Sequence, residues 1–103
     1  MHLVEILLPV RDNLGQPFSQ EKFQSIRDRL TDRFGGLTAF TRAPAEGFWR
    51  GGDDQRRLRE DVIVLEVMVD HLDRDWWKAF RIEMETTFAQ DEVVIRTQTI
   101  ERL

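Results

Sequence analysis

The sequence predicts a ferredoxin-like α+β domain with the element order βαββαβ. Four segments have the apolar, β-branched composition of strands, and two have apolar residues at the steps of three and four that amphipathic helices show. Each helix stands between two strands, so right-handed crossovers place the strands in the order 4-1-3-2, antiparallel throughout, with two helices on one face. A chain of 103 residues suffices for one core, and we predict a single domain, 1–103.

The predicted strands are short and are bounded by residues that break regular structure. The third strand is the clearest, because it is dense in β-branched residues. The four strands are predicted over 3–10, 37–42, 61–69 and 92–100.

The two predicted helices run from about 19 to 34 and from about 73 to 88. Ser19 and Asp73 are the expected N-cap residues, since their side-chain oxygens can accept from the free N–H groups of a first helical turn. The Gly35-Gly36 pair is the expected C-cap of the first helix.

Composition narrows the class of protein and its partners. The chain is 41% hydrophobic and 33% charged, as soluble globular proteins are, and its net charge of −4 gives no reason to expect nucleic acid or an anionic membrane as a partner. The apolar start is too short for a membrane span and lacks the features of a signal sequence, so a cytoplasmic location is expected. Without cysteine there is no disulfide, thiolate metal site or cysteine nucleophile.

The most unusual segment is "GFWRGGDDQRRLRED" (47–61), which joins the second and third strands. From 42 to 61 the arginines and the acidic residues are equal in number, which argues against a phosphate-binding patch. The segment is predicted as a long hairpin connection with its turn at 51–53. Trp49, with Arg50 beside it, is expected to fold over the sheet edge or onto a partner subunit, as a lid or dimer arm.

One face of the predicted sheet lacks the polar character of a solvated surface. Strands one and three are apolar on both faces, except for Glu5 and Glu66 on the face away from the helices. An antiparallel sheet in contact with water would alternate between apolar and polar residues. We therefore expect a second copy of the chain to cover this face, which makes the protein a homodimer.

The same face holds the candidate site. Strands one and three are neighbours, so Glu5 and Glu66 are expected to lie close together, and burial beside a like charge would raise the pKa of one carboxyl and suit it to general acid–base catalysis. The second interpretation is structural: the two glutamates form ion pairs with Arg96 and Arg42. The candidate catalytic residues are Glu5, Glu66 and Arg96, and the candidate ligand-binding residues are Phe40, Arg42, Trp49, Arg50 and Gln98.

The strand ends offer a possible metal site, because His2 and His71 stand near Asp70 and Asp73. Asp73 is already needed as an N-cap, and solvated strand ends explain these residues more simply, so no metal is predicted. The chain has two serines, one at a helix cap and one on a polar helix face, which cannot form a catalytic triad. No Gly-rich phosphate motif is present, and no cofactor is predicted.

Four stretches, "RFGGLTAF", "EGFWR", "REDVIVLEVMV" and "FAQDEVVIR", resemble an uncharacterised family of small bacterial α+β proteins. Its members combine Phe-x-x-Gly-Leu-Thr, Gly-x-Trp and Phe-x-Gln-(Glu/Asp)-x-Val elements; the chain departs from the first in its doubled Gly35-Gly36. The resemblance implies a ferredoxin-like fold and no established reaction. The matching positions are Phe34, Leu37, Thr38, Gly47, Trp49, Phe88, Gln90 and Val93.

Two functions remain open from the sequence. The first is a homodimeric module that binds a small molecule between the sheet and its partner, with or without catalysis. The second is a structural or protein-interaction module in which the second face serves only dimerisation.

Overall fold

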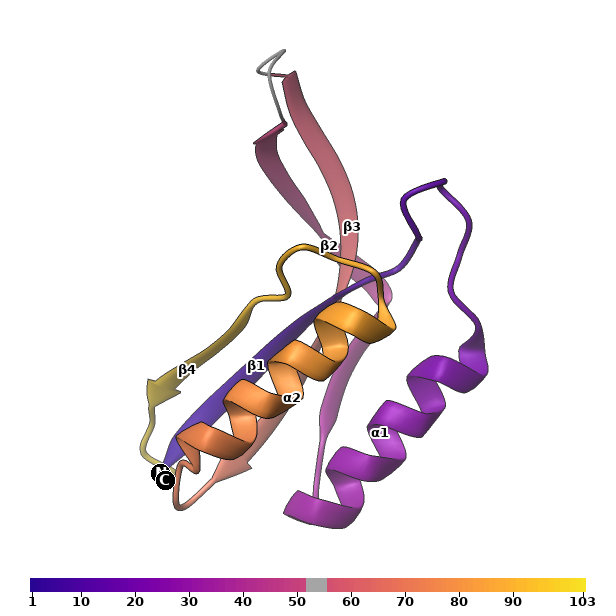
Figure 1. The fold of residues 1–103 in the computed structure, drawn as a ribbon. Coiled ribbons are helices and arrows are strands. Elements are labelled where there is room, and N and C mark those ends of the chain that lie inside the picture. The colour runs from indigo at the N-terminus through magenta and orange to yellow at the C-terminus, as the bar shows by residue number, and fades with distance from the viewer. Residues whose placement is uncertain (52–55) are drawn as a thin grey trace.

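The computed structural model has the predicted arrangement of a four-stranded sheet with two helices packed on one of its faces (Figure 1). It describes the backbone of residues 1–51 and 56–103, and the side chains of residues 1–40 and 62–103. The strand order β2-β3-β1-β4 is the predicted 4-1-3-2 counted from the other edge, and every neighbouring pair is antiparallel. The elements are β1 (His2–Pro9), α1 (Gln20–Phe34), β2 (Thr38–Gly51), β3 (Arg56–Val69), α2 (Arg74–Thr87) and β4 (Ile95–Thr99).

Local sequence signals set the helix ends. The Ser19 hydroxyl accepts from the N–H of Lys22 at 3.2 Å, and the Asp73 carboxylate accepts from the N–H of Trp76 at 3.1 Å. At the end of α1, Gly35 has a φ of 79°, which a residue with a Cβ adopts only at a cost. The predicted caps are thus confirmed.

The core lies between the sheet and the two helices. Alternate residues of β1 and β3 point toward the helices and meet the apolar stripe of each, as the period of two and the steps of three and four require. Its buried residues are Val4, Ile6, Leu8, Phe23, Ile26, Leu30, Ile63, Leu65, Val67, Val69, Trp77, Phe80, Met84, Phe88 and Val93.

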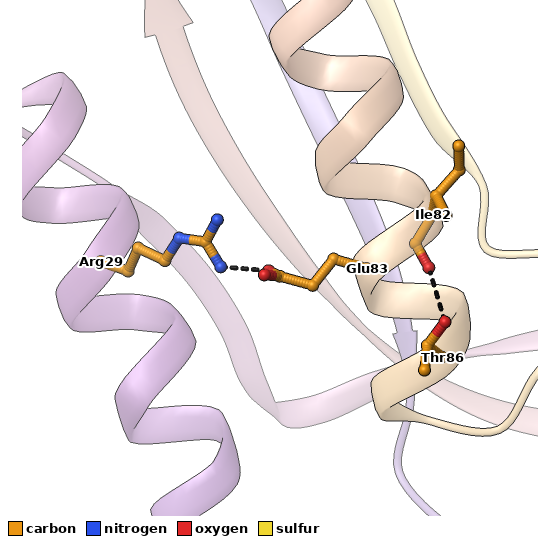
Figure 2. Close-up of polar contacts among 4 residues, drawn as sticks. All are labelled: Arg29, Ile82, Glu83 and Thr86. Carbon is orange, nitrogen blue, oxygen red and sulfur yellow. Dashed lines mark hydrogen bonds and ion pairs between the residues drawn. The ribbon is translucent and has the colours of Figure 1, made fainter.

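The two helices are joined to each other by aromatic packing and one ion pair. The ring of Phe34 stacks on that of Trp77, with 5.2 Å between centroids. Figure 2 shows the Arg29 guanidinium of α1 reaching the Glu83 carboxylate of α2. Both of these side chains are almost half exposed, so water screens the pair, and pairs of this kind contribute at most about 1 kcal/mol. Aromatic packing is therefore the stronger of the two links.

Strands β2 and β3 extend well beyond the sequence prediction. β1 pairs with β3 only as far as Pro9, opposite Val62, and beyond this point β2 and β3 pair with each other up to Gly51, opposite Arg56. A two-stranded ribbon has no face against the helices and needs no alternation of apolar and polar residues, which explains why the sequence pattern predicted a loop. The register shift between Phe40 and Ala45 surrounds a proline, which cannot donate to a strand ladder.

The remaining differences are small. β4 begins at Ile95, three residues later than predicted, although the Leu7 N–H still donates to the Val94 carbonyl at 3.0 Å. A turn was predicted at 51–53. Residues 52 and 53 lie outside the described residues. The two ends of the chain meet at one end of the sheet, where the Ile100 N–H donates to the Met1 carbonyl at 3.0 Å (Figure 1).

Candidate functional site

The face of the sheet away from the helices, called the open face below, carries the predicted charged residues in a single row. Glu5 of β1 lies opposite Glu66 of β3 on one side and opposite Arg96 of β4 on the other, and Glu66 lies opposite Thr38 of β2. These four residues, the charged row, cross all strands of the sheet. The open face consists of Leu3, Glu5, Leu7, Thr38, Phe40, Val62, Val64, Glu66, Met68, Arg96 and Gln98.

The arginine of the charged row pairs with only one of the two glutamates. Arg96 Nε donates to Glu5 Oε1 at 3.2 Å. The Glu5 side chain is 18% exposed and that of Arg96 is 59% exposed, so the arginine approaches the carboxylate from the solvent side. Among the described side chains, Glu66 has no cationic partner of this kind.

The pKa of the Glu66 carboxyl is raised above its ordinary value of 4.5. Removal of water from around the carboxyl is the largest cause, and repulsion by the neighbouring Glu5 is the second. A hydrogen bond that protonated Glu66 donates to Glu5 adds to the shift. Glu66 thus keeps its proton to a higher pH than an isolated glutamate does.

Apolar side chains surround the charged row. Leu3, Leu7 and Val64 are half-buried by their neighbours in the sheet, whereas Phe40 is 49% and Met68 50% exposed. Both helices cover the opposite side of the sheet, so no described helix covers the open face (Figure 1). The face therefore offers a partner an apolar surface with charges at its centre.

A hollow of about 390 Å³ adjoins this row at the end of the sheet where α1 finishes. Glu66 and Thr38 line its side toward the row. The remaining lining residues are Met1, Leu3, Phe34, Gly35, Gly36, Leu37, Met68, Asp70 and Arg102. A small molecule in this hollow would lie against the carboxyl with the raised pKa.

The structure brings together those predicted site residues whose side chains it describes. The three candidate catalytic residues, Glu5, Glu66 and Arg96, are neighbours in one row. Of the candidate ligand-binding residues, Phe40 lies opposite Val64 and Gln98 opposite Leu3, both on the open face. The side chains of Arg42, Trp49 and Arg50 lie outside the described residues.

The hollow was missed in the sequence, although one signal for it was present. In a βαβ unit the helix runs back along the first strand, so the Gly35-Gly36 turn must come near the start of β1 and the end of β3. The same turn thus brings Glu66 beside a helix end. The pattern of apolar and polar residues in a strand does not reveal this hollow. It shows which face of the sheet a side chain lies on, but not which helix end lies near the end of the strand.

At the strand ends that were weighed for a metal, His2 is part of β1 and His71 follows β3. The Asp73 carboxylate is used as the N-cap of α2. In residues 1–40 and 62–103, no group of three or more histidine, aspartate and glutamate side chains gathers as a metal site would require. None of the described helices has the length and apolar character needed to cross a membrane.

Comparison with known proteins finds similarity at the level of structure. No family model matches the chain, and no curated protein sequence does. A phage SAM lyase in complex with S-methyl-5'-thioadenosine superposes with a TM-score of 0.61 at 13% identity, over 94% of this chain and 79% of that one. A phage SAM lyase in its apo state gives a TM-score of 0.58 at 14% identity, over 94% of this chain and 78% of that one.

The periplasmic divalent cation tolerance protein CutA from Archaeoglobus fulgidus also superposes with a TM-score of 0.61, at 18% identity, over 99% of this chain and 86% of that one. Identities this low establish a shared fold and nothing about activity. The likeness to an uncharacterised bacterial family thus remains a resemblance of short motifs. The chain has the ferredoxin-like α+β fold that these proteins share, without assignment to a family.

Proposed function

We propose that the protein is a homodimer whose open faces pack on each other and which binds a small molecule between the sheet and its partner. Glu5, Glu66 and Arg96 form the polar centre of this site. The observation that carries the proposal is the position of Glu66, a carboxyl beside a second carboxyl on a largely apolar face.

The placement of Glu66 favours a functional role because it is unfavourable for the isolated chain. A carboxyl that is desolvated and repelled by a neighbour makes folding less favourable when it ionises. Residues that oppose stability in this way are expected at sites where they interact with a ligand or partner. With its raised pKa, Glu66 also has the chemistry of a general acid or base.

A second copy of the chain fits the open face in its apolar character and in its charges. The charged row has Arg96 at its β4 end. Toward its β2 end it has Glu66, for which no cationic partner is found among the described side chains. Packing about a two-fold axis parallel to the strands would set the arginine end of one row against the glutamate end of the other. The ribbon formed by β2 and β3 beyond the sheet adds a second reason, since an isolated two-stranded ribbon is marginal in water without packing.

The second candidate function is a purely structural one, in which the open face serves only assembly. It is favoured by the contact of Arg96 Nε with Glu5 Oε1, since a carboxylate that is already paired within its own sheet needs no ligand to offset its charge. Under this alternative, the hollow beside Glu66 fills with the partner's side chains.

Native mass spectrometry of the purified protein separates these functions. We expect a dimer that carries additional bound mass, or that is stabilised in a thermal-shift screen by members of a metabolite library. Glu5→Gln and Glu66→Gln should each remove the shift produced by such a compound, because they remove the charges at the centre of the site. Asp91→Asn, at an exposed position outside the open face, is the matched control and should keep the shift.

Each other outcome has a clear meaning. A dimer without bound mass, with no shift by any compound, supports the structural function. A shift that survives both glutamine variants excludes these carboxylates from the site. A monomer at micromolar concentration contradicts both functions.

Glu66→Gln is also expected to change the pH dependence of stability. Because the folded-state pKa of Glu66 is raised, its favourable contribution is complete below the ordinary value of 4.5 and is lost as the pH rises through the folded pKa. Below the concentration at which the chain dimerises, where no partner arginine reaches Glu66, the glutamine variant should therefore unfold at higher urea concentration than the wild type at about pH 7, and the difference should shrink toward about pH 4. Equal changes at both pH values would show that ionisation of Glu66 is not the cause.

A further inference from the structure

A second hollow lies between α2 and the edge strand β4, and it shares Arg96 with the open face. It has a volume of about 250 Å³, and four of its lining residues are cationic. Arg74, Lys78 and Arg81 come from α2, and Arg96 comes from β4. We call it the basic groove; its other lining residues are Val4, Leu72, Trp77, Ile95 and Thr97.

The cations of α2 converge because of their spacing. Arg74, Lys78 and Arg81 follow each other at steps of four and three, so they form one stripe along the helix, on the side that adjoins β4. Like charges at these steps repel each other and weaken a helix slightly. An anion bound in the groove would reverse this effect.

Of the side chains in residues 1–40 and 62–103, no acidic one lines the groove. Three of the acidic residues of α2 and its cap are engaged elsewhere, and the fourth, Asp75, lies in the first turn of the helix. Asp73 caps the helix, Glu83 pairs with Arg29 of α1, and Glu85 accepts from the backbone N–H of Val93 at 3.0 Å. Among the described side chains, none forms an ion pair with a cation of the α2 stripe.

The floor of the groove is apolar. Val4 and Trp77 are buried, and Leu72 and Ile95 are half-buried at its sides. An apolar floor beneath several cations suits an organic molecule that carries a compact anionic group. Arginine side chains recognise phosphate oxygens through paired N–H donors, and α2 presents two arginines and a lysine to one small volume.

We propose that the basic groove binds the phosphate group of a small phosphate ester, whose organic part lies on Trp77 and Ile95. The size of the hollow admits a small molecule and not a long polymer. The net charge of −4 also disfavours nucleic acid, because the rest of the surface repels it.

The test uses phenyl phosphate as a probe, with inorganic phosphate and phenol as its two halves. Titration calorimetry on the dialysed protein should show saturable binding of phenyl phosphate that is stronger than that of inorganic phosphate, and no binding of phenol. In amide NMR spectra, the shifts should gather in α2 and β4. The double substitution Lys78→Gln, Arg81→Gln should weaken binding at least about 10-fold, as expected for the loss of charged hydrogen bonds.

Arg27→Gln is the matched control, since it removes a positive charge from α1, away from the groove, and should leave the affinity unchanged. Equal binding by the double variant, no saturable binding at millimolar phenyl phosphate, or amide shifts elsewhere would overturn the proposal. Displacement of phenyl phosphate by a single-stranded oligonucleotide would overturn the ligand class. Glu66→Gln separates this site from the open face, because it should leave phenyl phosphate binding intact even if it abolishes the function proposed there.

Discussion

Phe88→Ala is expected to lower the free energy of unfolding by about 3–5 kcal/mol, the usual cost of removing a buried phenyl ring from a core. Phe88 has 0% exposure and is the largest fully buried side chain of the described part of the chain. Its ring meets the edge of Phe18 at 4.9 Å and lies 5.6 Å from that of Phe23, measured between centroids. It thus connects the end of α2 to the start of α1.

Urea denaturation followed by circular dichroism measures this effect. Domains of this size are stable by about 5–15 kcal/mol, so the variant should be severely weakened or unfolded at room temperature. Ile82→Ala on the same helix is the matched control, because Ile82 is 51% exposed and its truncation should change stability by less than about 1 kcal/mol. If the two variants lost equal stability, Phe88 would not be a core residue.

Val64→Lys is expected to break the proposed homodimer, with at least about a 100-fold rise in the dimer dissociation constant, or about 2.8 kcal/mol. Val64 lies on the open face between Leu7 of β1 and Phe40 of β2. A lysine there would bury an ammonium group in an apolar interface, which is costly even where Glu66 can approach it. The fold itself should survive, because the side chain points away from the helices.

Sedimentation equilibrium gives the dissociation constant, and circular dichroism verifies the fold. Ile82→Lys is the control for this variant: it adds the same charge at an equally apolar position on the surface of α2 and should leave the dimer intact. A Val64→Lys protein that dimerised as tightly as the Ile82→Lys protein would remove the open face from the interface.

The fold could be predicted because each element has two faces that differ in character. Where one face of a strand is packed on helices, as at Ile6 and Leu65, alternation fixes which side chains point inward. The same alternation places Glu5 and Glu66 on the opposite face, and the strand order makes them neighbours. The charged row could thus be predicted from the alternation of side chains along each strand and from the order of the strands.

Features that depend on the ends and edges of elements could not be predicted in this way. The ribbon beyond Val62 lies past the end of β1 and carries no periodic signal of burial. The stripe of Arg74, Lys78 and Arg81 is visible in the sequence, but its meaning depends on β4 closing the other side of the groove. Such sites arise from the juxtaposition of elements and leave no pattern in either element alone.

The meeting of the chain ends has a practical consequence for every binding measurement on this protein. Met1 and Arg102 both line the hollow beside Glu66, so residues added before the first position or after the last leave the domain at the rim of that hollow. An affinity tag at either end would compete with a ligand or a partner subunit for the same space. Tags should therefore be cleaved before binding is measured, since a tagged protein can fail to bind for reasons unrelated to Glu66.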